Sequence, residues 1–113
     1  MARRPVLENA VMDVVWESED WLTTAEVRGR LNRAVAATTV GTVLARLHKK
    51  GRVQRREQGR SIEYRAAESR EEFVASRMED ALDISRDRPV ALLEFVDRLS
   101  PEDRSRLAKL LRR

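Results

Sequence analysis

The sequence predicts a mainly α-helical protein that carries a small β-wing, and three observations lead to this fold class. In most of the 113 residues, apolar positions recur every three or four residues, which is typical of amphipathic helices. Around Gln58-Gly59 the pattern alternates instead, which is typical of a β-hairpin with glycine in its turn. The chain has 42% hydrophobic residues and no cysteine, so it can pack one ordinary domain, or a small head with a dependent tail, without disulfides.

The first predicted helix spans residues 5–16. Its apolar stripe consists of Val6, Leu7, Ala10, Val11, Val14 and Val15. The acidic stretch from Glu17 to Asp20 ends it, and Trp21-Leu22 follows as a short apolar segment that could pair as an edge strand. We interpret Trp16 and Trp21 as anchors of the hydrophobic core.

The second predicted helix has the clearest start signal in the chain. Thr23 and Glu26 have the spacing of a capping box, and apolar residues occupy the two positions of the matching hydrophobic staple. We therefore expect this helix to begin at Thr24 and to end near Arg33.

The third predicted helix spans roughly Thr38 to Lys50, and Gly51 stands where a C-cap glycine is expected. Its apolar stripe consists of Val40, Val43, Leu44 and Leu47. The opposite face carries Thr38, Thr42, Ala45, Arg46 and Lys49, with Thr39 on its flank. The alternating residues 53–66 follow as a basic hairpin, and three helices before such a hairpin make a winged helix-turn-helix.

After Ala67 the sequence predicts three further amphipathic helices, the second behind Pro89 and the third capped by Ser100 and Pro101. A segment of about 47 residues with three short apolar stripes cannot easily enclose a core, so we expect a second copy of the chain to cover them. The residues assigned to this dimerisation are Val74, Met78, Leu82, Leu92, Phe95, Val96, Leu99, Leu107, Leu110 and Leu111.

Positive charge is concentrated in the first part of the chain. Residues 1–66 hold thirteen Lys and Arg against eight Asp and Glu, whereas residues 67–113 hold ten against eleven. Within Thr38 to Ala66 there are eight basic residues and only two acidic ones, Glu57 and Glu63. Such a local excess indicates a polyanionic partner, and a helix-turn-helix points to double-stranded DNA.

The residue types on the third helix suit specific roles at DNA. Threonine can hydrogen-bond base edges or contact the thymine methyl, and arginine can bridge two guanine acceptors. We predict base contacts from Thr38, Thr39, Thr42 and Arg46, and phosphate contacts from Lys49, Lys50, Arg52, Arg55, Arg56 and Arg60. Residues 1–67 are thus predicted to form a winged helix-turn-helix DNA-binding domain, and residues 68–113 a helical dimerisation region.

Three stretches resemble a known family. The run from Thr39 to Gly51, with Thr42, Arg46-Leu47 and Lys49-Lys50, is similar to the recognition helix of the penicillinase repressor (BlaI/MecI) family. Val11-Met12 with Trp16 is similar to that family's first helix, and Gly59-Arg60 with Tyr64 to its wing. The match spans roughly Leu7 to Tyr64, about half of the chain, and the tail resembles the family only in its helical character.

The resemblance implies a homodimeric repressor on a palindromic operator. In well-known members a membrane sensor protease ends repression by cleaving an Asn-Phe bond in the dimerisation region. This sequence has no Asn-Phe bond, and Glu94-Phe95 is the nearest counterpart. Copper-responsive relatives use C-terminal cysteines, which this chain lacks.

Two other classes of function compete with a DNA-binding repressor. A winged-helix adaptor could use the C-terminal stripes to dock a different protein and never meet DNA. An enzyme is not expected, because the four glycines form no phosphate loop and the lone His48 has no neighbouring nucleophile or acid. We expect no metal and no cofactor. No segment approaches the roughly 20 apolar residues of a membrane span, and the start of the chain has no signal-peptide pattern, so we expect a cytoplasmic protein.

Overall fold

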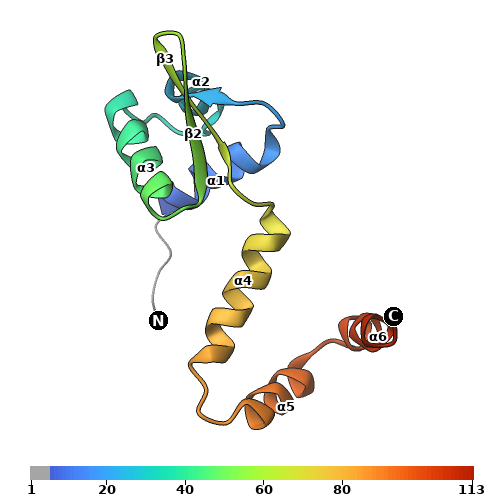
Figure 1. Ribbon diagram of the computed structural model, residues 1–113. Helices are drawn as coiled ribbons and strands as arrows, with labels where there is room; N and C mark the ends of the chain where they lie inside the picture. The colour runs from blue at the N-terminus through green and yellow to red at the C-terminus, as the bar shows by residue number, and fades with distance from the viewer. Residues whose placement is uncertain (1–5) are drawn as a thin grey trace. The chain divides into compact units, whose positions relative to one another are not determined.

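The computed structural model describes residues 6–113, and Pro5, the predicted start of the first helix, lies outside the described residues. The elements are α1 (Val6–Glu17), β1 (Leu22–Thr23), α2 (Thr24–Arg30), α3 (Ala37–Lys49), β2 (Val53–Gln58), β3 (Ser61–Ala66), α4 (Arg70–Asp83), α5 (Arg88–Arg98) and α6 (Pro101–Leu111) (Figure 1). The chain divides into two compact units: a head that ends at Glu72, and a tail from Phe73 to Arg113. The head is a winged helix-turn-helix, and the tail is helical, as the sequence predicts.

One hydrophobic core holds the head together. The apolar stripes of α1 and α3 meet in it, joined by single residues from β1, α2, β2 and β3. Its buried side chains are Val11, Met12, Val14, Val15, Leu22, Val27, Val40, Val43, Leu44, Leu47, Val53 and Tyr64. Burying each large apolar side chain contributes about 1.5–3 kcal/mol, so the inner stripe of α3 is firmly held and its other face is directed outward.

Helix α2 begins where the sequence predicts, at Thr24. The backbone N–H of Glu26 donates to Oγ1 of Thr23 over 3.1 Å, and the backbone N–H of Thr23 donates to Oε1 of Glu26 over 3.0 Å. This is the predicted capping box, and it satisfies two backbone donors that the helix itself leaves open.

The predicted end of α2 near Arg33 is wrong, because the helix stops at Arg30. Leu31 adopts an extended conformation with φ −75° and ψ 139°, and the side chains of Leu31 and Val35 both pack against the core. Nε of Arg28 donates to the carbonyl of Val35 over 2.6 Å. Core packing at both ends of the turn therefore shortens the helix and fixes the connection to α3.

The sheet has the strand order β1-β3-β2, and both pairings are antiparallel. Arg55 of β2 pairs with Tyr64 of β3, and Arg56 pairs with Glu63. Directly paired residues share a face of the sheet, so Arg55 lies on the face of the buried Tyr64 and Arg56 on the opposite face. Gly59 has a φ of +62° in the turn between β2 and β3, which a residue with a Cβ rarely adopts.

The start of α4 belongs to the head and is fastened to α1. The indole N–H of Trp16 donates to the carbonyl of Glu68 over 3.0 Å. The guanidinium of Arg70 lies 5.0 Å from the centre of the Trp16 ring and pairs with Asp13 over 3.2 Å. Trp16 therefore packs at the border of the core while its indole N–H is hydrogen-bonded, which is consistent with its predicted role as an anchor.

The tail contains the rest of α4 with α5 and α6. Asp87 caps α5 by accepting a hydrogen bond from the backbone N–H of Val90 over 3.2 Å. Ser100 caps α6, as predicted, by accepting one from the backbone N–H of Asp103 over 3.1 Å. Neither α5 nor α6 has a buried residue. None of the helices in the described part of the chain is long and apolar enough to cross a membrane.

Candidate nucleic-acid interface

The exposed face of α3 carries all four residues that the sequence predicts as base contacts. Thr38, Thr39, Thr42 and Arg46 are exposed, whereas the helix buries its apolar stripe beneath them. A hollow of about 320 Å³ lies beside this face, lined by Leu7, Glu8, Thr39, Thr42, Val43 and Arg46. The structure thus brings Thr39, Thr42 and Arg46 together at one hollow, and Thr38 lies one turn before Thr42, outside its lining.

The hydroxyl groups on α3 are not equivalent. Oγ1 of Thr42 donates to the carbonyl of Thr38 over 3.0 Å, so the Thr42 side chain keeps its methyl group and an acceptor lone pair for a partner. Ala36 stands at the N-cap and provides no side-chain cap. The first backbone N–H groups of α3 therefore remain available to an anion such as a phosphate.

The two lysines at the end of α3 have different surroundings. The side chain of Lys49 is exposed and makes no hydrogen bond or ion pair within residues 6–113. Nζ of Lys50 donates to both carboxylate oxygens of Glu8 over 3.0 Å. The Glu8 side chain is only 8% exposed, so Lys50 compensates a buried charge on α1. This contact favours a structural role for Lys50, in place of the predicted phosphate contact.

The side chain of Arg52 is likewise engaged within the head, beside Trp16. Its guanidinium centre lies 5.8 Å from the centre of the Trp16 ring, and its Nε and Nη2 atoms are shielded from solvent. These two atoms are therefore not exposed to a phosphate in solution. The geometry therefore favours packing at the border of the core as the role of Arg52.

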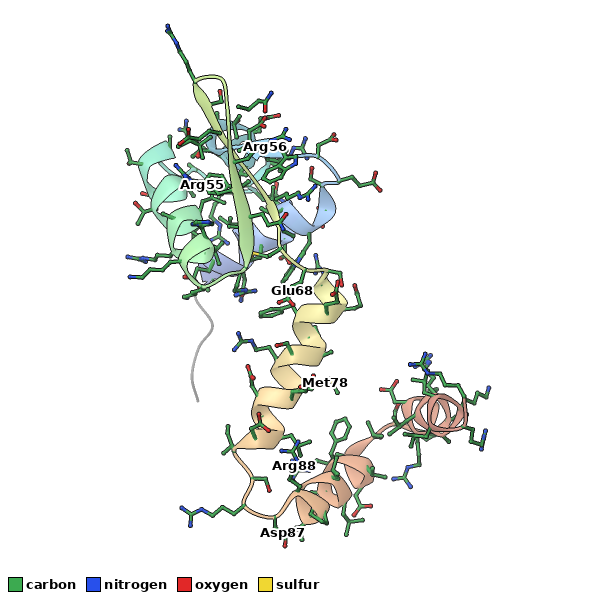
Figure 2. All side chains as sticks on the ribbon, viewed as in Figure 1. Arg55, Arg56, Glu68, Met78, Asp87 and Arg88 are labelled. Carbon is green, nitrogen blue, oxygen red and sulfur yellow. The ribbon has the colours of Figure 1, made fainter. Side chains whose placement is uncertain are left out.

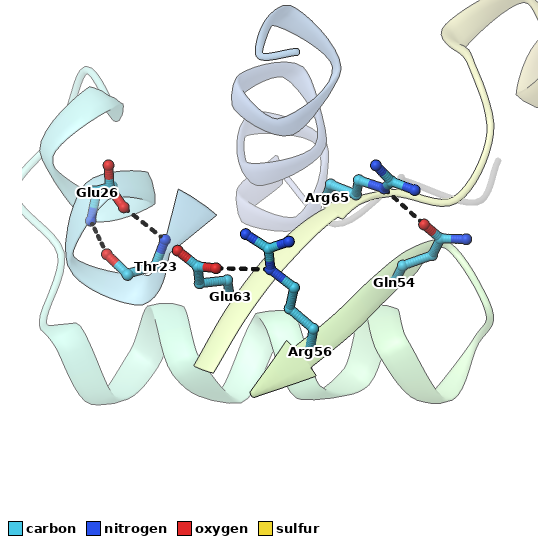
Figure 3. A network of polar contacts seen from close by, with 6 residues as sticks. All are labelled: Thr23, Glu26, Gln54, Arg56, Glu63 and Arg65. Carbon is cyan, nitrogen blue, oxygen red and sulfur yellow. Dashed lines mark hydrogen bonds and ion pairs between the residues drawn. The ribbon is translucent and has the colours of Figure 1, made fainter. Parts of the chain in front are cut away.

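The wing separates the three arginines that the sequence predicts as phosphate contacts. Arg55 and Arg56 extend from opposite faces of β2 (Figure 2), and Arg60 lies exposed in the hairpin turn. Arg55 has one ion pair, at 3.9 Å with Glu57, which is too long to hold it firmly. Nε of Arg56 donates to Glu63 over 2.8 Å (Figure 3). Arg55 and Arg60 thus remain available to DNA, whereas Arg56 is engaged within the sheet.

Sequence reasoning missed one cluster on the outer face of the sheet and misread one of its members. The ring of Trp21, interpreted as a core anchor, is half-buried, and the guanidinium groups of Arg56 and Arg65 lie 4.5 and 4.6 Å from its centre. Arg65 also donates to Gln54 over 2.8 Å. The alternation of the strands could have placed Arg56 and Arg65 on one face, but no local signal indicated that Trp21 contacts both of them.

The tail exposes six of the ten residues predicted for dimerisation. Six of them are 44–78% exposed: Val74, Met78, Leu92, Phe95, Leu110 and Leu111. Leu82, Val96, Leu99 and Leu107 are half-buried. An apolar groove of about 340 Å³ is lined by Met78, Ala81, Leu82, Ala91, Leu92 and Phe95. The predicted set omitted Ile84, Val90 and Leu93, which are 83%, 52% and 60% exposed. All three are apolar, so a search for every apolar residue in the tail would have included them.

Comparison with known proteins identifies the family. The profile of the family described as penicillinase repressor matches residues 6–113. The chain belongs to the penicillinase repressor family. This confirms the resemblance seen in the sequence and the assignment to transcriptional regulators rather than enzymes.

Curated relatives of this family are similar over most of the chain. "Transcriptional regulator BlaI" from Mycobacterium tuberculosis, in strains CDC 1551 and H37Rv, is 38% identical over 110 residues, which cover 93% of this chain and 80% of the relative. A solved MarR family protein from Bacillus stearothermophilus has a TM-score of 0.52 at 19% identity, covering 98% of this chain and 72% of that one. The second similarity supports the winged helix-turn-helix fold alone.

Proposed function

We propose that this penicillinase repressor family member is a sequence-specific transcriptional repressor that binds a palindromic operator as a homodimer in the cytoplasm. The observation that carries the proposal is the outward face of α3. Its inner stripe is buried in the core, and its threonines and Arg46 face solvent in the described part of the chain. A helix in this arrangement can enter the major groove without rearranging the head.

The residues divide by role. Thr38, Thr39, Thr42 and Arg46 read base edges, because their side chains share the exposed face of α3. Lys49, Arg55 and Arg60 hold phosphates, because their cations are exposed and weakly engaged. Lys50, Arg52 and Arg56 maintain the head through Glu8, Trp16 and Glu63.

The exposed apolar side chains of the tail support a homodimer. Within the described residues of the tail, Phe73 is the single buried hydrophobic side chain. Helices without a buried face are not stable alone in water, because ordering them costs conformational entropy that packing must offset. A second copy would cover the apolar groove and the exposed leucines of both tails.

Two heads joined in this way would meet the major groove at half-sites one helical turn, or a multiple of it, apart. A dimer bound across a promoter would exclude RNA polymerase. A membrane sensor protease, if one relieves repression, would have to cleave a bond other than Asn-Phe, which this sequence lacks.

A footprint of the full-length protein on the DNA that flanks its own gene tests this proposal. We expect protection of a palindromic sequence, and a binding curve that requires the dimer. Arg46→Ala should relax sequence preference, whereas Lys49→Ala should weaken binding to all sequences alike and reduce the salt slope by about one unit per head. Equal losses on operator and random DNA in both variants would contradict the division of roles.

A protein–protein adaptor is the second candidate, and the exposed Ile84, Val90 and Leu93 favour it because they lie outside the predicted dimer stripe. Light scattering of the pure protein separates the two. A dimer that binds duplex DNA supports the repressor, whereas a monomer that ignores duplexes at low salt supports the adaptor.

A further inference from the structure

We infer that Trp21 is a positioning residue that sets the angle of the wing relative to α3, through the cation stack that it forms with Arg56 and Arg65. The inference deepens the proposed function, because it concerns how the wing arginines reach operator DNA. Trp21 itself is not expected to touch DNA.

The orientation of the wing needs an additional contact, because the hydrophobic core holds only the end of the hairpin that is far from the turn. In β2 only Val53 is buried, and the other five residues of the strand are exposed. In β3 the buried residue is Tyr64. Strand β1 pairs with β3 only at Glu63 and Tyr64, so residues 57–62 form a two-stranded hairpin beyond it, and such a hairpin is marginally stable unless another contact holds it. Arg60, a proposed phosphate contact, lies in this unsupported part, whereas Arg55 pairs with the buried Tyr64 at its base.

The stack joins both strands of the wing to one ring. Arg56 comes from β2 and Arg65 from β3, and their guanidinium centres lie 4.5 and 4.6 Å from the centre of the Trp21 ring. Both distances are within the range of a cation–π contact. An aromatic ring can hold two planar cations on its π-system, which an aliphatic side chain cannot.

Two hydrogen bonds across the strands fix the orientation of the guanidinium groups. Nε of Arg56 on β2 donates to Glu63 on β3, and Nε of Arg65 on β3 donates to Gln54 on β2, both over 2.8 Å (Figure 3). The Glu63 carboxylate also reduces the repulsion between the two cations. The Trp21 ring therefore meets groups that are already locked within the hairpin.

Trp21 transmits this position to the recognition helix. It precedes β1, whose Thr23 caps α2 through the capping box, and α2 packs directly on α3. A change in the ring would thus alter the wing angle without removing any residue from the proposed DNA contacts. The stack adds to the pairing of β1 with β3, in which Leu22 and Thr23 lie opposite Tyr64 and Glu63.

A double-mutant experiment on the full-length protein tests the inference. Operator affinity is measured by fluorescence anisotropy for Trp21→Leu, Arg60→Ala and both together. We expect each single variant to lose about fivefold in affinity and the double variant to lose little more than either, because a misplaced wing no longer benefits from Arg60. Trp21→Tyr, which keeps an aromatic face, should restore most of the affinity.

Lys49→Ala is the matched control, because Lys49 lies on α3 and does not depend on the wing. Trp21→Leu and Lys49→Ala should therefore multiply their losses. Should the losses of Trp21→Leu and Arg60→Ala also multiply, the positioning role is overturned. If Trp21→Leu does not fold, Arg65→Gln or Arg56→Gln takes its place in the double-mutant cycle with Arg60→Ala. Each of these variants removes one of the two cations that contact the Trp21 ring.

A measurement without DNA separates this inference from the proposed function. Backbone amide hydrogen exchange of residues 54–57 should be faster by about tenfold in Trp21→Leu than in the wild type, while exchange in α1 is unchanged. A wild-type protein that does not bind operator DNA would contradict the proposed function. The exchange rates would still show whether Trp21 holds the wing in place. Unchanged exchange at residues 54–57 would overturn the inference.

Discussion

Replacing Lys50 with methionine should destabilise the head, whereas the same replacement of Lys49 should leave stability unchanged and weaken DNA binding. Methionine keeps most of the aliphatic stem and removes the charge. Lys50 donates two hydrogen bonds of 3.0 Å to Glu8, whose side chain is 8% exposed, while Lys49 is exposed without such a partner in residues 6–113. The two lysines are neighbours on one helix end, so each serves as the control for the other.

The size of the effect follows from the burial of the two groups. Hydrogen bonds to charged groups contribute about 1.5–3 kcal/mol, and the loss of Lys50 would leave the Glu8 carboxylate buried and unpaired. Lys50 is itself 52% exposed, so water already screens part of the attraction. We therefore expect a loss of about 1–2 kcal/mol, which lowers the Tm by about 5–15 °C in a domain of this size.

Thermal and urea unfolding followed by circular dichroism measure this loss, at one fixed protein concentration because the proposed dimerisation would raise the apparent Tm. Lys49→Met should stay within about 0.5 kcal/mol of the wild type. Glu8→Gln combined with Lys50→Met should be more stable than Lys50→Met alone, because the unpaired carboxylate is gone. Equal Tm values for the two lysine variants, or a salt slope of DNA binding that falls equally in both, would refute the reasoning.

Three further predictions concern the capping box, α3 and the tail. Hydrogen bonds with the backbone N–H of Thr23, and then with its side chain, hold the pKa of Glu26 below its ordinary value of 4.5. The capping box therefore stabilises the head fully above pH 4.5, and this contribution is lost as the pH falls through the lower pKa of the folded state. Urea unfolding between pH 3 and 7 should show this loss, and Glu26→Gln should flatten it. Gly41→Ala should stabilise the head by about 0.5–1 kcal/mol, because the new Cβ would meet Cγ2 of Thr24 at an ordinary 3.9 Å; a lower Tm would contradict this. Phe95→Asp should turn the proposed dimer into a monomer in light scattering, because Phe95 lines the apolar groove and is 44% exposed.

Local rules predicted most of the fold. The start of α2 depends on residues three positions apart, and the hairpin turn depends on one glycine, so both can be found in the sequence. The end of α2 could not be predicted, because Leu31 leaves the helix in order to pack against a core that distant residues complete. A local pattern contains no information about that competition between helix propensity and tertiary packing.

The roles of the cations were less predictable than the helices, because they depend on residues far away in the chain. Glu8 is 42 positions from Lys50, and Trp21 precedes both Arg56 and Arg65 by more than thirty positions. Charge density alone predicts six phosphate contacts per head, whereas the geometry favours Lys49, Arg55 and Arg60. For a dimer the slope of log affinity against log salt should then be about −5 rather than about −11, because each phosphate contact contributes about −0.9. A measured slope near the larger value would mean that Lys50, Arg52 and Arg56 leave their partners when the protein binds DNA.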